Sequence, residues 1–297
     1  EIGMSNFGEV ERLSAIASPT SAVVTNIGIS HIEQLKTQEN IRAEKLHIAD
    51  TIGEQGALYL NGDDPMLPQL RESSTGKIVW YGMESDCDYR AVNIDTVKDC
   101  TRFELHAPFG AHKIMIPALG LHNVSNALAA IAVAYDQGLT LDDIRCGLLT
   151  YEGLAMRQQI HELDKITVID DSYNASPDSI KSGIGVLMAV KSTGKKIAVL
   201  ADMLELGERS AQAHLELGAY AAANGVDAVL TVGREAEKIA EGAAEESRKI
   251  LVKACGTNDE AFAELEKILN DGDCVLVKGS RGMHTDEIVQ KLLTKYQ

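Results

Sequence analysis

A lysine interrupts the apolar face of a helix that the sequence predicts at residues 39–54. At 100° per residue, Ile41, Ile48 and Ile52 fall on one side of that helix, and Lys45 lies about 40° from them. An ammonium group without a partner is costly to bury. Either the Lys45 side chain extends along the apolar surface until it reaches water, or its charge is neutralised or chemically altered in a site.

Two other polar residues occur in the same region of the sequence. His31 follows a predicted buried strand at 21–28 by three residues, and Glu1 is the first residue. Each of them alone is typical of a solvated surface side chain. Because both lie near strand ends of one region, a carboxylate oxygen and an imidazole nitrogen could instead share a divalent cation there.

A pair of asparagines opens a predicted helix at 121–137, directly after Gly120. Asn123 and Asn126 are three residues apart and therefore share one face of the first turn. Asparagine at a helix start commonly caps the helix. Two carboxamides on one face could equally contact the donor and acceptor edge of a nucleotide base, so both interpretations stay open.

Two acidic residues, Asp170 and Asp171, end the strand predicted at 166–170 and begin the loop after it. An acidic side chain at this position of an α/β sheet can accept a hydrogen bond from a ribose hydroxyl. The alternative is that it caps the next helix, but Ser176 followed by Pro177 fits that role better. We therefore expect the aspartates to serve a ligand.

The elements that must position these residues form two regions. In the first, a strand at 21–28, the helix at 39–54 and a strand at 56–61 form a βαβ unit, which requires a parallel sheet. Short strands without helices between them come next and predict an antiparallel patch. These strands lie at 77–81, 90–97, 101–107 and 112–116, and helices follow at 121–137 and 140–150.

After Arg157, strands and helices alternate regularly, which predicts a doubly wound α/β domain. The predicted strands lie near 166–170, 196–202, 227–233, 249–254 and 273–278. The predicted helices lie near 178–191, 208–224, 234–246, 258–270 and 284–295. The sequence thus predicts two domains, 1–157 and 158–297. Since ligands bind beyond the carboxyl ends of strands in such sheets, we expect the site in the strand-end loops.

The composition of the 297 residues excludes several classes of protein. A formal net charge of −16 without a concentration of basic residues argues against partners such as nucleic acid or an anionic membrane surface. The apolar stretches are too short for a membrane span, which favours a cytoplasmic location. Five scattered cysteines indicate neither a disulfide framework nor a zinc site.

The start of the chain suggests missing N-terminal sequence. Glu1 takes the place of an initiating Met, and the apolar-to-glycine opening is typical of the end of a strand. The sequence also contains no GxxxxGK[ST] motif, the loop that holds nucleotide phosphates in P-loop enzymes. We therefore expect a fragment that by itself lacks the phosphate site.

Taken together and in order, the loop motifs resemble those of the Mur ligases of peptidoglycan synthesis. The motifs are Glu1-Ile-Gly-Met-Ser-Asn-Phe-Gly-Glu, Thr25-Asn-Ile-Gly with His31, Ala43-Glu-Lys45, Leu60-Asn-Gly-Asp-Asp64, Gly120-Leu-His-Asn-Val-Ser-Asn-Ala127, Asp170-Asp-Ser-Tyr-Asn-Ala175, Ala201-Asp-Met-Leu-Glu-Leu-Gly207 and Val277-Lys-Gly-Ser-Arg281. They cover essentially the whole chain. Ala201 stands where the family usually has Gly. The Asp-Asn-Pro-Arg motif of the diaminopimelate-adding branch is missing, which favours the dipeptide-adding branch.

The resemblance implies a fold and an activity. The fold would be a P-loop-type central domain that lacks its P-loop, followed by a Rossmann-like C-terminal domain. The activity would be ATP-dependent amide formation through an acyl phosphate, with ATP and Mg²⁺ as cofactors and with UDP-N-acetylmuramoyl-tripeptide and D-alanyl-D-alanine as partners. The protein would be a monomer, and this chain alone would be inactive. The alternatives are a non-catalytic module with this fold, or a related amide ligase of the diaminopimelate-adding or folylpolyglutamate type.

The resemblance also implies roles for individual residues. As Mg²⁺ ligands it assigns Glu1, His31 and Lys45, and we expect Lys45 to be buried near the other two and carbamylated, with His31 and Lys45 taking part in catalysis. As nucleotide contacts it assigns Asn123 and Asn126 to adenine, Asp171 to the ribose and Arg157 to the hinge between domains. As the surface for the incoming dipeptide it assigns Lys278, Ser280 and Arg281.

Overall fold

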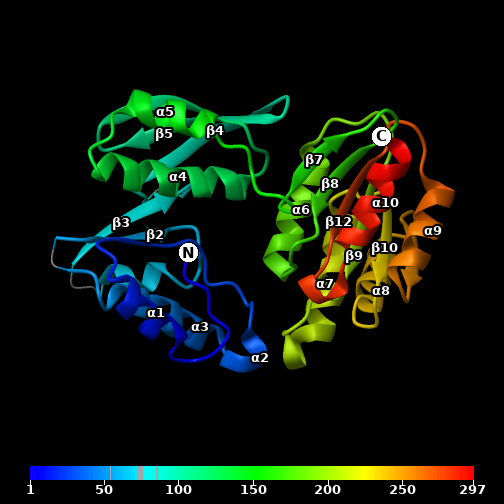
Figure 1. Ribbon diagram of the computed structural model, residues 1–297, viewed down its shortest axis with the longest axis horizontal. Coiled ribbons are helices and arrows are strands. Elements are labelled where there is room, and N and C mark those ends of the chain that lie inside the picture. The colour runs from blue at the N-terminus through cyan, green and yellow to red at the C-terminus, as the bar shows by residue number, and fades with distance from the viewer. Residues whose placement is uncertain (54, 73–75, 85) are drawn as a thin grey trace. The chain divides into compact units, whose positions relative to one another are not determined.

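The computed structural model describes residues 1–53, 55–72, 76–84 and 86–297. The chain forms two compact units, Glu1–Glu152 and Gly153–Gln297, each with its own sheet (Figure 1). Both units are of the α/β type, which confirms the expected fold class. Every helix in the described ranges is too short or too polar to cross a membrane.

The first unit contains a mixed six-stranded sheet with strand order β1-β2-β3-β4-β5-β6. The strands are β1 (Ala22–Val24), β2 (Ala57–Asn61), β3 (Lys77–Gly82), β4 (Tyr89–Val97), β5 (Cys100–Ala107) and β6 (Gly110–Ile116). Neighbours from β1 to β4 are parallel, whereas β4, β5 and β6 are antiparallel. The expectation that 77–81 belongs to the antiparallel patch is therefore wrong. Val79, Trp80 and Tyr81 are all buried, as is usual for a parallel strand covered on both faces.

The helices of this unit differ from expectation mainly near the start of the chain. They are α1 (Glu9–Ala17), α2 (Ile32–Leu35), α3 (Gln38–Leu46), α4 (Leu121–Asp136) and α5 (Leu141–Leu149), with 3-10 turns η1 (His47–Ala49) and η2 (Pro68–Glu72). Helix α1 was not expected, and residues 1–4 form no strand. The helix expected at 39–54 ends at Leu46, and its last expected residue, Glu54, lies outside the described residues. Helix α4 packs against β2, β3 and β4 and supplies much of the core.

The second unit contains a six-stranded sheet with order β11-β10-β9-β12-β8-β7. The strands are β7 (Gln159–Glu162), β8 (Thr167–Asp171), β9 (Lys196–Ala201), β10 (Ala228–Val232), β11 (Leu251–Cys255) and β12 (Cys274–Lys278). All pairs are parallel except β7 with β8. The five parallel strands were expected. Strand β7 was missed because it is short and half-exposed, without a continuous apolar run.

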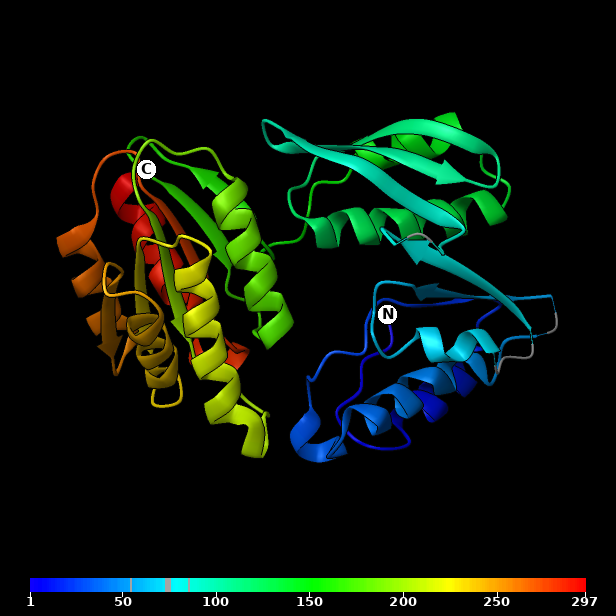
Figure 2. The same cartoon turned by 180° about the vertical axis from the view of Figure 1, so that it is seen from behind.

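Helices cover both faces of this second sheet (Figure 2). They are α6 (Pro177–Ala189), α7 (Ser210–Ala223), α8 (Glu237–Glu246), α9 (Asn258–Ile268) and α10 (Asp286–Tyr296), with 3-10 turns η3 (Gly207–Arg209) and η4 (Arg281–Met283). Helices α6, α7 and α8 pack in a row on one face, and α9 packs with α10 on the other. The expected cap of α6 is confirmed: Ser176 forms a capping box with Ser179, and Pro177 begins the helix.

Candidate functional site

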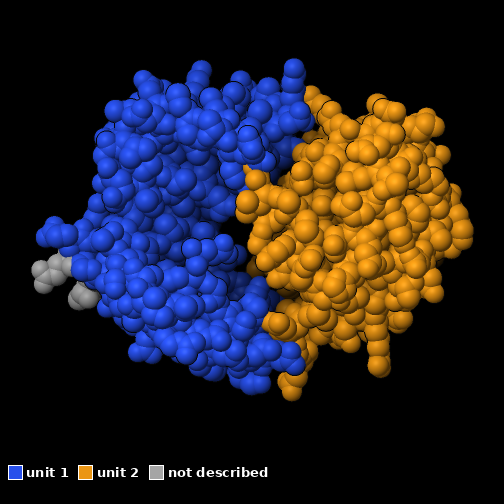
Figure 3. All heavy atoms as spheres, in the orientation of Figure 1, with its two compact units in different colours: residues 1–152 blue, residues 153–297 orange. Residues whose placement is uncertain are grey.

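A buried ion pair joins the carboxyl ends of β8 and β12 in the second unit (orange in Figure 3). Asp171 and Lys278 are register partners on these neighbouring strands. The Nζ atom of Lys278 lies 2.8 Å from Oδ2 of Asp171, and their side chains are only 3% and 8% exposed. Nζ also donates a hydrogen bond to the carbonyl oxygen of Asn174 at 2.9 Å. The pair thus fixes the loop after β8 to the end of β12.

The electrostatics of the pair follow from its burial. Loss of water raises the pKa of Asp171, and the Lys278 ammonium opposes that rise. Burial likewise lowers the pKa of Lys278, while the Asp171 carboxylate opposes it. Hydrogen bonds from Lys278 and from Gln158 also hold the pKa of Asp171 down against the effect of burial. Each charge is therefore tolerated inside the unit because the other is present.

Asp170, the neighbour of Asp171, has a local role. Its Oδ1 atom accepts hydrogen bonds from the backbone N–H of Ser172 at 3.1 Å and from the Ser172 hydroxyl at 2.5 Å. These contacts hold the turn that follows β8. Of the two aspartates, Asp171 is thus the one that faces another strand end.

Arg157 lies close to this ion pair on the segment that leads into β7. Its guanidinium group lies 4.3 Å from the centre of the Tyr173 ring, a cation–π contact. The backbone N–H of Tyr173 donates to the carbonyl oxygen of Met156 at 3.1 Å. Met156 and Gln158 on either side of Arg157 both have positive φ, 61° and 55°. The segment is therefore held in a left-handed path against the loop after β8.

The loop after β12 contributes two more predicted residues. Ser280 is 4% exposed, and its Oγ accepts a hydrogen bond from the backbone N–H of Leu204 at 2.9 Å. Arg281 is exposed, with Nη1 3.5 Å from Oδ1 of Asp286 and 3.9 Å from the sulfur of Met156. The structure thus brings five predicted residues to one edge of the second unit: Arg157, Asp171, Lys278, Ser280 and Arg281.

In the first unit, Lys45 is placed differently from expectation. Its Nζ donates to the carbonyl oxygen of Asn26, in the loop after β1, at 2.8 Å. The expectation that Lys45 is buried is wrong, because its side chain is only half-buried. The buried charge on α3 is Glu44, 3% exposed, whose carboxylate accepts from the backbone N–H groups of Gly8 and Val10 at 3.0 Å each.

The three predicted metal ligands do not form a metal site as unmodified side chains. His31 is half-buried with φ of 60°, directly before α2, and Glu1 is exposed. Across the described ranges, no three His, Cys, Asp or Glu side chains gather closely enough to hold an ion. Lys45 in its ammonium form cannot ligate a cation. A third ligand would exist here only if Lys45 were carbamylated, so we derive no chemical step through a metal.

The two asparagines of α4 do not cap the helix. The N-cap residue is Gly120, with φ of 92°, and no side chain accepts a capping hydrogen bond there. Nδ2 of Asn123 donates to the carbonyl oxygen of Leu119 at 2.8 Å, and Asn126 is exposed. The cap interpretation is therefore wrong for both residues, and contact with a nucleotide base stays a prediction.

Sequence reasoning missed a buried carboxylate that ties together two strand-end loops of the first unit. Asp64, 7% exposed, accepts hydrogen bonds from the backbone N–H of Ile27 at 2.7 Å and of Met66 at 2.8 Å. Ile27 follows Asn26, whose carbonyl oxygen binds Lys45. The Asn-Gly-Asp-Asp-Pro stretch at 61–65 indicated a turn, but nothing in it showed that one of its aspartates reaches back to the first strand.

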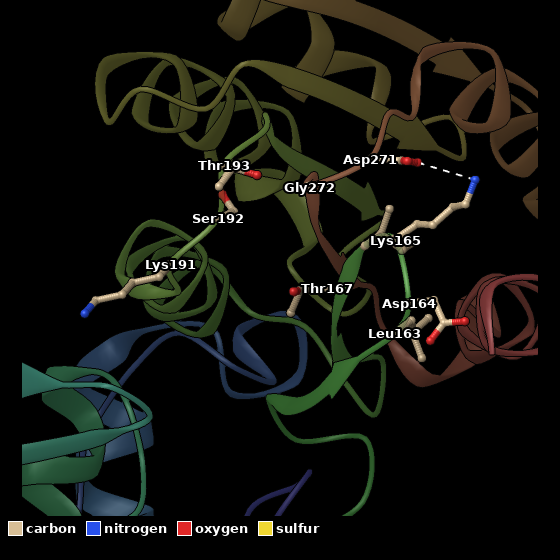
Figure 4. Close-up of a pocket in the computed structure, with 10 residues that line it drawn as sticks. Leu163, Asp164, Lys165, Thr167, Lys191, Ser192, Thr193, Asp271 and Gly272 are labelled. Atoms are coloured by element: carbon tan, nitrogen blue, oxygen red, sulfur yellow. Dashed lines mark ion pairs between the residues drawn. The ribbon is translucent and has the colours of Figure 1, made fainter.

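A cavity of about 420 Å³ lies elsewhere in the second unit (Figure 4). It is lined by Leu163, Asp164, Lys165, Ile166, Thr167, Lys191, Ser192, Thr193, Asp271 and Gly272. These residues precede or begin β8, β9 and β12, so the cavity is at the amino ends of the strands. None of the predicted site residues lines it. The strand-end rule for α/β sheets places ligands at the opposite edge.

The chain is similar to known proteins over almost its whole length. It is 36% identical over 294 residues to UDP-N-acetylmuramoyl-tripeptide--D-alanyl-D-alanine ligase from Bacillus subtilis, a match that covers 99% of this chain and 63% of that protein. The Escherichia coli protein of the same name is 29% identical over 295 residues, with 98% and 64% covered.

Solved structures agree with this similarity. A crystal structure of MurF from Acinetobacter baumannii superposes with a TM-score of 0.89 at 30% identity, covering 99% of this chain and 64% of that one. MurF ligase from Thermotoga maritima in complex with ADP gives 0.87 at 27% identity, covering 100% and 66%. The chain thus spans less than two thirds of the length of these relatives.

Two family models match consecutive parts of the chain. Residues 1–134 match the Mur ligase middle domain, and residues 156–281 match the Mur ligase, glutamate ligase domain. All ten predicted site residues lie within one of these two ranges. Two parallel-rich α/β units, ordered matches to both domains of one family and close structural relatives lead to one conclusion: the chain belongs to the Mur ligase family.

Proposed function

We propose that this chain is part of an ATP-dependent ligase that joins D-alanyl-D-alanine to UDP-N-acetylmuramoyl-tripeptide in peptidoglycan synthesis. The observation that carries the proposal is the match over 99% of the chain to a ligase named for that reaction. Structures of the alanine-adding and diaminopimelate-adding ligases share only 19% and 18% sequence identity with this chain. The stretch Asp202–Gly207, in place of an Asp-Asn-Pro-Arg motif, supports the same branch.

The reaction takes place in two steps. A carboxylate oxygen of the tripeptide attacks the γ-phosphorus of ATP, and ADP leaves, so that an acyl phosphate forms. The amine of the dipeptide then attacks the acyl carbon, loses a proton, and the amide forms as inorganic phosphate leaves. Both steps develop negative charge on oxygen, which cationic groups stabilise.

For the nucleotide we propose contacts from both units. Asn123 and Asn126 would contact adenine, Asp171 the ribose, and Arg157 another part of the nucleotide. The support in the second unit is geometric: the carboxylate of Asp171 is held by Lys278, and Arg157 is held by Tyr173. A carboxylate held in one place accepts hydroxyl hydrogen bonds without first becoming ordered.

For the acceptor dipeptide we propose the loop after β12. Arg281 is exposed and can meet a carboxylate. Lys278 and Ser280 are buried, so their contribution would be to hold the backbone that presents Arg281. For Mg²⁺ we propose Glu1, His31 and carbamylated Lys45. The functional domains would be 1–157 and 158–297 in a monomeric, cytoplasmic enzyme.

The test uses a version of this chain extended at its N-terminus to include a P-loop, here called the extended protein. It is assayed for phosphate release with ATP and Mg²⁺ in three reactions. The first contains UDP-N-acetylmuramoyl-tripeptide and D-alanyl-D-alanine, the second UDP-N-acetylmuramoyl-L-alanyl-D-glutamate and diaminopimelate, and the third a folate and glutamate. Turnover is expected only in the reaction that contains D-alanyl-D-alanine. Turnover with diaminopimelate or glutamate in its place would overturn the proposed branch of the family.

The second candidate is a non-catalytic module, favoured by the absence of a GxxxxGK[ST] motif from the 297 residues. The 297-residue chain by itself is expected to release no phosphate under the same conditions, because phosphoryl transfer depends on groups that position the phosphates, such as those of a P-loop. Calorimetric titration with adenosine and with ATP measures the binding that is left. Turnover at the rate of the extended protein would show that other residues hold the phosphates.

A further inference from the structure

The loop after β9 is fixed at three consecutive backbone N–H groups by three different parts of the second unit. The N–H of Asp202 donates to the carbonyl oxygen of Val232 at 3.1 Å. The N–H of Met203 donates to Nε2 of His214 at 3.0 Å, and that of Leu204 donates to Oγ of Ser280 at 2.9 Å. Two side chains from α7 and from the loop after β12 therefore determine the path of this loop.

His214 is buried, with 0% exposure, and its two ring nitrogens have defined roles. Nδ1 lies 2.7 Å from the carbonyl oxygen of Ser210, which can only accept, so Nδ1 carries the proton. Nε2 must then be the acceptor for Met203. If Nε2 were protonated, its N–H would point at the N–H of Met203, and two donors cannot form a hydrogen bond. The geometry thus requires a neutral ring.

Charged groups near the ring act in the opposite direction to burial. Burial lowers the pKa of His214, whereas the Ser210 carbonyl and the carboxylates of Asp202 and Glu235 raise it. Oγ of Ser210 donates to Oε2 of Glu235 at 2.8 Å, so this carboxylate is already bound. A lowered pKa means that folding favours the neutral ring. The stabilisation is present above the unfolded pKa, about 6.5, and is lost as pH falls.

The loop presents one apolar side chain to solvent close to the segment that carries Arg281. Met203 and Leu206 are buried, but Leu204 between them is 46% exposed. Cδ1 of Leu204 lies 3.1 Å from the place where a Cβ on Gly282 would be, so Leu204 covers the segment that carries Arg281. An exposed leucine and an exposed guanidinium on these two adjacent segments suit a ligand with a small apolar group and a carboxylate, as an amino acid or short peptide has.

We propose that His214 is a positioning residue for the amine acceptor: through Met203 it holds the loop so that Leu204 packs against the apolar side chain of the incoming dipeptide while Arg281 meets its carboxylate. The inference rests on the function proposed above. The contacts that carry it are the hydrogen bonds of the Met203 and Leu204 N–H groups, which hold the two peptide groups that lead into the Leu204 Cα.

The experiment measures kcat and KM for D-alanyl-D-alanine and for ATP in the extended protein and its variants. His214→Leu removes the acceptor for Met203, and a buried N–H left without a partner destabilises the loop, so KM for the dipeptide is expected to rise about tenfold. His214→Gln, which keeps an acceptor oxygen, is expected to recover most of the loss. KM for ATP should stay unchanged. The control is Gln212→Leu, exposed on the same helix.

A second variant keeps the test valid if His214→Leu fails to fold. Leu204→Ala removes an exposed side chain, so the fold is retained, and KM for the dipeptide is expected to rise about tenfold from the lost apolar contact. In the chain as given, ¹⁵N chemical shifts at pH 7 should show a neutral ring with the proton on Nδ1. If the extended protein joins no dipeptide, the proposed function fails. If it does, but dipeptide KM is unchanged in His214→Leu and Leu204→Ala, or the ring is protonated, this inference is overturned.

Discussion

The two units place charge at their strand ends in different ways. In the second unit, Asp171 and Lys278 are buried and paired side chain to side chain. In the first unit, the residues predicted to hold a metal are exposed or half-buried, and Lys45 binds a backbone carbonyl. The strand-end edge of the second unit is therefore ordered by its own side chains. At the first edge, the metal site that we propose would require a chemical change, the carbamylation of Lys45.

Energetics explain why the two arrangements differ. A buried charge without its partner is strongly destabilising, so the second edge depends on both members of its pair for folding itself. An exposed carboxylate such as that of Glu1 keeps its water, so folding of the first unit does not depend on an ion-pair partner for it. The predictions below test this contrast between a prearranged edge and an edge that is completed later.

The largest expected effect is on the stability of the second unit. Lys278→Met leaves the Asp171 carboxylate buried without its ion-pair partner, which should lower the free energy of unfolding by about 3–5 kcal/mol in urea denaturation of the chain. The double variant Asp171→Asn with Lys278→Met should recover much of this. The matched pair in the first unit is Lys77 with Asp136, 55% and 20% exposed.

Lys77→Met is expected to cost less than about 1 kcal/mol, as exposed ion pairs do. Equal losses for Lys278→Met and Lys77→Met would remove the contrast between the two units.

The next prediction is a loss of activity with little change in the free energy of unfolding. In the extended protein, Lys45→Ala should lower kcat by about 100-fold or more, because the proposed carbamylated side chain stabilises charge in the reaction. The free energy of unfolding should fall by no more than about 1 kcal/mol, since the half-buried side chain donates a hydrogen bond to Asn26 and does not belong to the core. Added bicarbonate should not restore it. ¹³C-labelled bicarbonate should give a carbamate signal in the parent protein only. Lys36→Ala, an exposed lysine nearby, serves as control. Full activity of Lys45→Ala would refute the assignment.

A smaller effect is expected at the buried carboxylate of the first unit. Glu44→Gln keeps one acceptor oxygen but cannot accept from both Gly8 and Val10, so the free energy of unfolding should fall by about 2 kcal/mol. Hydrogen exchange at Val10 should accelerate more than at β3 or α4. Glu11→Gln, exposed on α1, provides the comparison. Unchanged exchange at Val10 would mean that Glu44 does not hold this helix.

The smallest effects should be the same in both units. Ser176 in the second unit and Thr140 in the first each form a capping box. Replacing either by Ala should cost about 1 kcal/mol, since a cap acts locally. Denaturation of the two variants side by side measures this. A difference of more than 2 kcal/mol between them would show that the units differ in general stability, so that the contrast is not confined to their charges.

Much of the fold could be predicted because the second unit alternates apolar strands with helices. The five parallel strands and the start of α6 at Pro177 were expected from residue types alone. Prediction from the sequence was wrong where the strand order depends on pairing between residues far apart in the chain. Strand β3 has the length of a hairpin strand, but it pairs in parallel with β2 across the intervening segment. Neither β7 nor α1 has the continuous apolar pattern that would have revealed it.

The site could be predicted only as a set of strand-end loops. Which polar residues are buried depends on partners far away in the sequence, as with Asp171 and Lys278, 107 residues apart by number. The apolar face predicted from Ile41 and Ile48 indicated an unusual lysine at position 45. However, α3 ends before Ile48, and the buried charged residue of this helix is Glu44. His214 lies in an Ala-rich helix with no motif that points to Met203.

The outer strands of the second sheet bear on how the protein behaves at high concentration. Strand β7 is only four residues long and runs antiparallel to its neighbour, and it carries His161 and the exposed Glu162. On the opposite side, β11 exposes Lys253. Short edge strands and outward charges hinder the addition of further strands from another molecule. The unit therefore keeps an apolar parallel sheet in its centre while its edges resist the edge-to-edge pairing that leads to aggregates.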